Sequence, residues 1–395
     1  MFSAISRSWQ PIRRWLTSAS STDGLEVTDS ETTGSILATV PLPAAIAQKF
    51  SLAIADLSLP QTYQDTLRSQ VDEALQQWRS DPQVPNHLVI ITEPTEPLEK
   101  YRRWILEQGD WAAVALLSDW AERPPDYTVM VEKLTQAVET VQAGDEPGQV
   151  IVLPSLDQCF LRCADGLAGI DYLRDAVTSD RNHFWVLSCN QWAWRYLDSV
   201  CHIQAYFKQI FRVPKLDGLA LKQWLSPLEA SVDHTFKTAE QAASEKPAAA
   251  GDEVSEQWAS PTEQQYFETL AAAAGGISQV AAALWLRSLG YQEAESTSEP
   301  VSESNSVILK KLAFTQLPDL TASDRYLLFS LTLHRTLSIA HLALSLGNSI
   351  DQTMNQSLPL QRQDLIAVAH ASYQLNPAYY LSLRANLRRN NFIVD

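Results

Sequence analysis

Two hydrophobic patterns alternate along the middle of the chain. Between residues 87 and 225, unbroken runs of apolar residues are separated by stretches in which apolar residues recur at intervals of three and four. Unbroken apolar runs are typical of strands buried on both faces of a sheet, and the longer interval is typical of amphipathic helices. We therefore predict an α/β fold in which helices cover a parallel sheet. The predicted strands are 87–91, 111–117, 150–154, 183–189 and 210–213.

Residues 1–16 form a separate amphipathic segment. Its large apolar residues recur at intervals of three and four, so a helix would gather them in one stripe. Arg7, Arg13 and Arg14 lie off the stripe, and Pro11 interrupts or kinks the helix. Two interpretations stay open: the segment lies in a membrane interface, or it docks on the protein's own body or on a partner. The apolar residues are Phe2, Ile5, Trp9, Ile12 and Leu16.

Stretches of low complexity divide the rest of the chain. They are rich in Ser, Thr, Ala and acidic residues, and such compositions favour linkers or disordered loops. The predicted linkers are 17–35, 236–261 and 293–307. The domains between and after them are 36–235, 262–292 and 308–395.

The last two of these domains have helical patterns. Residues 262–292 are predicted to form two helices that meet at Gly275 and Gly276. The break is placed there because glycine is common where a helix ends. In 308–395, three helices precede a strand-like stretch and a closing helix. Three helices followed by a β-ribbon match a winged helix-turn-helix domain.

Composition narrows the classes of protein to which this chain can belong. The formal net charge of −16 argues against a general nucleic-acid binder, because phosphate contacts need a basic surface. The sequence has no run of about 18 apolar residues, and arginines and a proline interrupt its first apolar residues. We therefore predict neither a transmembrane helix nor a signal peptide. We expect a cytoplasmic protein, peripheral to the inner face of a membrane if residues 1–16 bind lipid.

The cysteines give no sign of a metal centre. None of the four forms a CxxC pair, and no histidine lies at zinc-ligand spacing beside them. We predict free, buried thiols and no metal site. The cysteines are Cys159, Cys163, Cys189 and Cys201.

The first strand leads into a helix through TEPTEPLE, a connection with the frame of a phosphate-binding loop. Such a loop needs GxxxxGK followed by Ser or Thr. The glycines let backbone N–H groups approach the phosphates, the lysine neutralises charge and the hydroxyl holds magnesium. On this junction the four positions fall on Thr92, Pro97, Leu98 and Glu99, and none matches.

The order of the parts resembles that of the AAA+ and STAND ATPases, most nearly the origin-recognition and helicase-loader ATPases. The resemblance covers about residues 60–395 and implies a P-loop-like core, a helical lid with a Gly-Gly turn and a C-terminal winged helix. In this family a magnesium-binding acid follows the Walker B strand. Here VIVL is followed by Pro154, and Asp157 comes three residues later. Asn190, at the end of HFWVLSC, matches the family's polar sensor residue.

We interpret the α/β domain as a pseudo-ATPase. Glu93, Glu96 and Glu99 would repel a triphosphate, and Pro97 has no N–H to donate to it. The strand, loop and helix bury apolar surface without a nucleotide, so the frame can persist after the chemistry is lost. We predict no cofactor and no catalytic residue. The alternative is an active ATPase with a nonstandard nucleotide site.

The C-terminal domain is predicted to bind protein rather than DNA. Its candidate recognition helix, SIDQTMNQSLPLQ, contains an aspartate and no basic residue, whereas DNA readers present Arg and Lys. The side-chain amides on this helix could form hydrogen bonds with the edges of DNA bases. A DNA-binding transcriptional regulator therefore stays an alternative. The candidate surface residues are Gln352, Asn355, Gln356, Arg384, Arg388 and Arg389. The whole sequence thus predicts a non-catalytic regulatory or scaffold protein that acts through protein–protein contacts, and leaves its oligomeric state open.

Overall fold

The computed structural model describes most of the chain after residue 38. The described residues are 39–81, 83–117, 123, 126–143, 148–230, 232, 257–258, 260–292, 306–309, 312 and 316–392. The predicted helix 1–16, with Phe2, Ile5, Trp9, Ile12, Arg13, Arg14 and Leu16, and the predicted linker 17–35 lie outside them.

The described residues fall into two compact units. The larger unit comprises the described parts of Leu59–Lys215, Ile277–Val280 and Thr315–Asp395. The smaller unit comprises those of Met1–Ser58, Leu216–Gly276 and Ala281–Phe314. Each unit has its own sheets.

A five-stranded parallel sheet forms the centre of the larger unit, as the apolar runs predict. Its strand order is β3-β4-β5-β2-β6. The two central strands, β2 and β5, are buried at every residue, which explains why they have no polar alternation. The strands are β2 His87–Thr92, β3 Ala113–Ala115, β4 Val150–Val152, β5 Phe184–Asn190 and β6 Ile210–Arg212.

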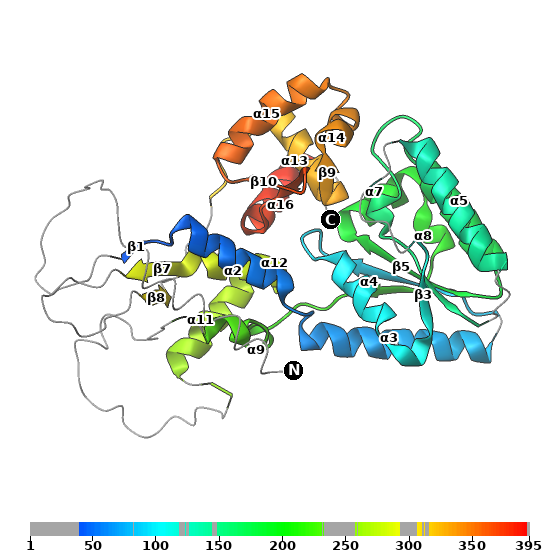
Figure 1. Ribbon diagram of the computed structural model, residues 1–395, viewed down its shortest axis with the longest axis horizontal. Coiled ribbons are helices and arrows are strands. Elements are labelled where there is room, and N and C mark those ends of the chain that lie inside the picture. The colour runs from blue at the N-terminus through cyan, green and yellow to red at the C-terminus, as the bar shows by residue number, and fades with distance from the viewer. Residues whose placement is uncertain are drawn as a thin grey trace, which may run out of the picture. The chain divides into compact units, whose positions relative to one another are not determined.

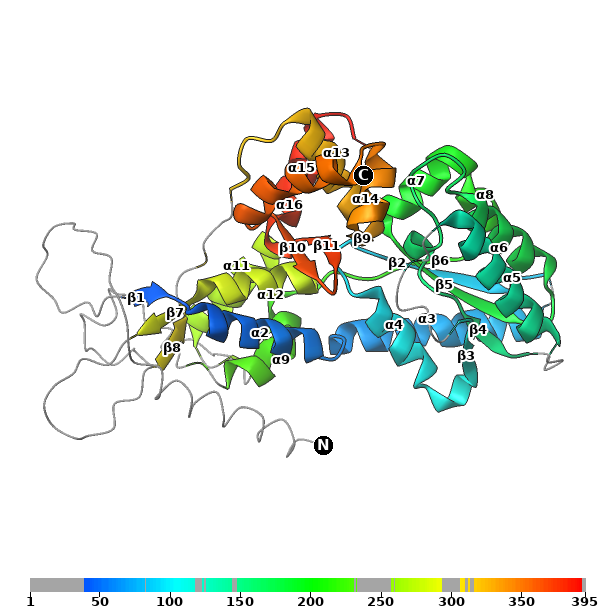
Figure 2. The same ribbon diagram turned by 45° about the horizontal axis from the view of Figure 1, so that its top comes forward.

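Helices cover both faces of this sheet (Figures 1 and 2). α3 and α4 lie on one face, and α5 and α6 lie on the other. In α3 the buried residues recur at intervals of three and four, and its other faces are polar. The helices are α3 Gln61–Ser80, α4 Leu98–Leu106, α5 Tyr127–Ala143, α6 Ala168–Ser179, α7 Gln191–Cys201 and α8 Ile203–Tyr206.

The C-terminal module of the larger unit combines four helices with a small antiparallel sheet. Thr321 and Ser349 form capping boxes at the starts of α13 and α15, so each of these helices begins at its own side-chain cap. The strand-like stretch is the hairpin β10–β11, and β9, which the sequence analysis did not predict, pairs with β11. The elements are α13 Ala322–His334, β9 Thr336–Ser338, α14 Ile339–Leu346, α15 Ile350–Arg362, β10 Ile366–Ala369, β11 Ser372–Leu375 and α16 Tyr380–Arg389.

The smaller unit is a group of helices with a three-stranded antiparallel sheet, ordered β1-β7-β8. Ser260 caps α11 at its start, and Gly275 ends it at a φ of 61°, a backbone conformation that favours glycine. α12 begins at Ser278, so the predicted break at Gly275 and Gly276 separates two helices. The elements are β1 Thr39–Pro41, α2 Ala44–Asp56, α9 Gly218–Glu229, α11 Pro261–Ala274, β7 Leu289–Gln292, β8 Ser306–Leu309 and α12 Ser278–Ser288, of which Ser278–Val280 belong to the larger unit.

The division into units differs from the boundaries that we predicted at 36–235 and 308–395. α2 and α9 pack with α11 and α12: Phe50 meets Trp285 edge to face at 5.7 Å, and Lys222 pairs with Glu263 at 2.8 Å. Gly218 allows α9 to approach α11, because a Cβ there would lie 2.9 Å from the backbone nitrogen of Glu268.

The structure describes parts of two of the predicted linkers. Ser306 and Val307 belong to β8, so the loop predicted for 293–307 ends before them. The remaining residues of that loop, 293–305, lie outside the described residues, as does most of the predicted linker 236–261.

Candidate functional site

The candidate site lies at the carboxyl edge of the five-stranded sheet. β2 and β5 are parallel neighbours in register, so their last residues, Thr92 and Asn190, end side by side. The chain leaves β2 and continues to β3, which lies at the far edge of the sheet on the β5 side. It leaves β5 and continues to β6, which lies at the opposite edge beside β2. Open α/β sheets bind ligands outside the carboxyl ends of the strands where the strand order reverses in this way.

The four positions that a phosphate-binding loop would use are engaged in other ways. Thr92 ends β2, and its hydroxyl donates to the carbonyl of Glu93 at 3.1 Å. Pro97 precedes α4 as its N-cap, and Leu98 is buried in the core. The Glu99 carboxylate lies 3.9 Å from Arg102, and burial raises its pKa.

Glu96 fills the space between this loop and the start of α12. Its Oε1 accepts a hydrogen bond from the Ser278 backbone N–H at 2.8 Å. The Ser278 hydroxyl lies 2.9 Å and 2.8 Å from the two carboxylate oxygens. The Tyr63 hydroxyl donates to Oε1 at 3.3 Å. Only 2% of Glu96 is exposed, so these groups replace the water that an acid normally binds.

The Glu96 carboxylate lies at the N-terminus of α12, a position that favours anions. The N–H groups at the start of a helix are free and carry partial positive charge, so they bind phosphates and carboxylates. At the start of α12 the bound anion is the carboxylate of Glu96, a residue of the protein itself. Burial raises the pKa of Glu96 to about 7, although the hydrogen bonds from Ser278 and Tyr63 act in the opposite direction.

The end of β4 holds an acid without exposing it. Pro154 is buried, and Asp157 is fully buried in the 3-10 helix Leu156–Gln158. The Ser155 hydroxyl donates to Oδ1 of Asp157. Oδ2 lies 3.8 Å from Nη1 of Arg335, which follows α13. Asp157 is therefore aimed at a cation of the C-terminal module.

Asn190 uses both ends of its amide. As the N-cap of α7, its oxygen accepts from the backbone N–H groups of Trp192 and Ala193 at 3.0 and 2.9 Å. Its nitrogen donates to the carbonyl of Leu333 at 2.8 Å. The residue that matches a polar sensor thus connects β5, α7 and α13.

His334, at the end of α13, packs against the same edge of the sheet. Its Nε2 accepts from the backbone N–H of Arg162 at 3.2 Å, and its Nδ1 lies 3.3 Å from the carbonyl oxygen of Asp157. Nδ1 also lies 3.3 and 3.4 Å from the two terminal guanidinium nitrogens of Arg123. Burial and the neighbouring Arg123 hold the pKa of His334 well below its usual value.

A second contact joins the module to the loop. The Tyr380 hydroxyl donates to Glu93 at 2.7 Å, and the Tyr380 ring packs on Trp192 at 5.7 Å. Glu93 and Glu96 therefore hold two different segments, α16 and the start of α12. The sequence revealed the acids of the loop but not their partners, because Ser278 lies 182 residues after Glu96.

The predicted surface residues of the C-terminal module lie on two helices. On α15, Gln352 and Asn355 are exposed, although Gln352 also accepts from the Ser349 backbone N–H in the capping box. Gln356 is half-buried. On α16, Arg384 is half-buried, and Arg388 and Arg389 are exposed in the last turn, where positive charge complements the helix dipole.

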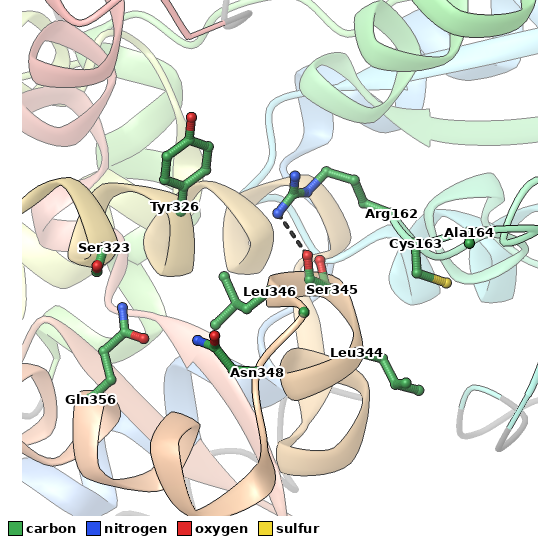
Figure 3. A pocket seen from close by; sticks show the side chains of 11 residues that line it. Arg162, Cys163, Ala164, Ser323, Tyr326, Leu344, Ser345, Leu346, Asn348 and Gln356 are labelled. Carbon is green, nitrogen blue, oxygen red and sulfur yellow. Dashed lines mark hydrogen bonds between the residues drawn. The ribbon is translucent and has the colours of Figure 1, made fainter.

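A cavity of about 500 Å³ lies between the C-terminal module and the segment 162–164 (Figure 3). Arg162 reaches across it and donates to the carbonyl oxygen of Ser345 at 2.8 Å. Tyr326, Leu344 and Gln356 are also part of its wall. This cavity could not be predicted from the sequence, because its walls come from segments far apart in the chain.

The described residues contain no group of three His, Cys, Asp or Glu side chains placed to hold a metal ion. All four cysteines are free thiols, but only Cys159 and Cys189 are buried as predicted, whereas Cys163 and Cys201 are half-buried. Among these residues no helix combines the length and the apolar character that crossing a bilayer requires. Trp185, Trp192 and Trp194 are core residues with full burial.

Comparison with family models and with curated proteins returned no match. Two solved structures show a distant likeness. A point mutant of RuvB from Thermotoga maritima is 14% identical, with a TM-score of 0.32; the match covers 81% of this chain and 94% of that one. A chain of the HORMA–CdnC–Trip13 complex of E. coli is 14% identical, with a TM-score of 0.31 and coverage of 60% and 80%. Scores this low do not establish a common fold.

Proposed function

We propose that this chain is a nucleotide-independent regulatory or scaffold protein. Its α/β core has the layout of an AAA+ or STAND ATPase without the catalytic chemistry, and its C-terminal module is a winged helix that binds protein. Residues 1–16 add a membrane tether or a docking helix.

One observation carries the proposal. The Glu96 carboxylate lies at the N-terminus of α12 with hydrogen bonds from Ser278 and Tyr63. A triphosphate bound to this loop would have to displace or approach that buried acid. An ionised Glu96 and a triphosphate in a poorly solvated site repel each other strongly, and the loop TEPTEPLE has no glycine or lysine to compensate.

The contacts of the C-terminal module support the same function. Asp157, the nearest acid to a Walker B position, points at Arg335, and Asn190 is hydrogen-bonded to Leu333 and α7. Groups that could hold magnesium or sense a phosphate are thus already used to attach the module to the core. In this proposal the layout serves to attach the C-terminal module to the core rather than to bind a nucleotide.

The proposal is tested by measuring phosphate release and nucleotide binding together. Purified protein is incubated with ATP and magnesium, and bound nucleotide is measured by equilibrium dialysis. We expect no turnover above the protein-free control and no saturable binding. Magnesium-dependent turnover that disappears in Asp157→Asn, while Asp72→Asn on the exposed face of α3 retains it, would establish the active-ATPase alternative.

A further inference from the structure

α15 carries an apolar stripe on its exposed surface. Ile350, Met354 and Leu358 are 48%, 46% and 44% exposed. They are four residues apart, so they follow one another along one side of the helix. The face that packs on the module is different and contains Thr353, Ser357 and Leu360. Nothing in the fold of the module requires the exposed stripe.

The charges of α15 are few and lie at its two ends. Asp351 is in the first turn and Arg362 is in the last turn, and both side chains are exposed. They are eleven residues apart in the sequence, which is about three helical turns, so they project from the same side of the helix. That arrangement offers no basic surface for a phosphate backbone.

The apolar stripe and the two charges of α15 are arranged symmetrically about Gln356, so they can pair with the same groups on an antiparallel second copy. Met354 and Leu358 lie at equal distances along the chain from Gln356, and the midpoint between Asp351 and Arg362 falls beside the same residue. If a second α15 runs antiparallel with a two-fold axis at this point, Met354 faces Leu358 of the second copy. Asp351 then lies near Arg362 of the second copy, and the stem of that arginine covers Ile350.

We propose that the chain forms a symmetric dimer in which α15 packs antiparallel against α15 of a second copy. Two features favour a second copy over other occupants. An antiparallel pair opposes the helix dipoles and forms the Asp351–Arg362 ion pair twice. The segment 317–395 contains six arginines, no lysine and five aspartates, so two modules meet with little of the repulsion expected between chains of charge −16.

The other occupants suit this surface less well. The basic segment 1–16 is predicted to have an apolar stripe of its own, but its three arginines would meet a single acid, Asp351, on α15. One helix pair buries less than the roughly 1,200 Å² of a standard stable interface. The dimer is therefore weak, with a dissociation constant in about the micromolar range or above.

The full chain is tested by sedimentation velocity over about a hundredfold range of concentration. We expect a concentration-dependent shift from monomer to dimer. Met354→Asp should raise the dissociation constant at least about tenfold, because two carboxylates would then lie in the interface. Leu52→Asp is the matched control: Leu52 is 60% exposed on α2, and its substitution should leave association unchanged. Circular dichroism checks that each variant is folded.

A charge exchange tests the antiparallel register. Asp351→Arg should weaken the dimer by about two- to tenfold, and the double variant Asp351→Arg, Arg362→Asp should restore it. A monomer at every concentration, or loss of association on deletion of residues 2–16, would overturn the proposal. A dimer that is insensitive to both Met354→Asp and the charge exchange would overturn it equally.

Discussion

Replacing Glu96 by glutamine removes a buried ionisable group and keeps its shape. The amide oxygen can accept from the Ser278 N–H and from Tyr63, and the amide nitrogen can donate to the Ser278 hydroxyl. The hydrogen bonds of the loop can therefore be retained, whereas the cost of burying a charge disappears.

The magnitude follows from the pKa of Glu96. Its folded-state value of about 7 lies above the ordinary 4.5, and this difference corresponds to about 3 kcal/mol. Because the folded-state pKa is raised, the folded protein holds the proton more tightly than the unfolded chain. Glu96 thus reduces the free energy of unfolding as pH rises from about 4.5 to about 7, and the loss is complete above pH 7.

The assay is urea unfolding of the wild type and of Glu96→Gln between pH 5 and pH 8, followed by tryptophan fluorescence. Other titrating groups, such as His334, contribute equally to both proteins, so the difference between the curves isolates Glu96. We expect the two proteins to be close in stability at pH 5 and the variant to gain up to about 3 kcal/mol at pH 8.

Glu73→Gln is the control, because Glu73 is an exposed acid on α3 and its substitution should give a difference that does not change with pH. A pH-independent difference for Glu96→Gln as well would refute the reasoning. It would show that the Glu96 carboxylate has water or a cation beside it.

Three further substitutions test the contacts around the site, each by denaturant unfolding against wild type. Asn190→Ala removes the cap of α7 and leaves the Leu333 carbonyl unpaired, so it should cost about 2–4 kcal/mol; a cost below about 0.5 kcal/mol would contradict the geometry. Tyr380→Phe removes the hydrogen bond to Glu93 and should cost about 1–2 kcal/mol, with no change expected if that bond is absent. Gly218→Ala places a Cβ 2.9 Å from the backbone of α11 and should cost about 1–3 kcal/mol, whereas a stabilised protein would mean that α9 and α11 are further apart.

The sheet could be predicted from the sequence because its signal is local. β2 and β5 are unbroken apolar runs, and being buried on both faces they need no polar alternation. The capping residues Thr321 and Ser349 are equally local signals, because each caps the helix that begins at the next residue.

Apart from the two helices that meet at Gly275 and Gly276, the smaller unit could not be predicted, because it depends on contacts between distant segments. β1 pairs with β7 from the other half of the chain, with Thr39 opposite Gln292. Strands of three or four residues leave no periodic pattern long enough to recognise. α2 and α9 each show an apolar face, but nothing in that face indicates whether it packs on the sheet or on α11.

The candidate site shows the same limit. The sequence places Thr92, Pro97 and Glu99 at the junction of a strand and a helix, and it shows that glycine and lysine are missing there. It does not show that Glu96 rather than Glu93 or Glu99 is the buried acid. That choice depends on Ser278, whose position is set by the folding of the whole larger unit.

The most direct test of the central claim is a crystal structure of the protein grown with ATP and magnesium. The account predicts no triphosphate density between Thr92 and Lys100, and a Glu96 carboxylate that still accepts its hydrogen bond from the Ser278 N–H. Triphosphate density against that loop, with Glu96 turned away from Ser278, would contradict it.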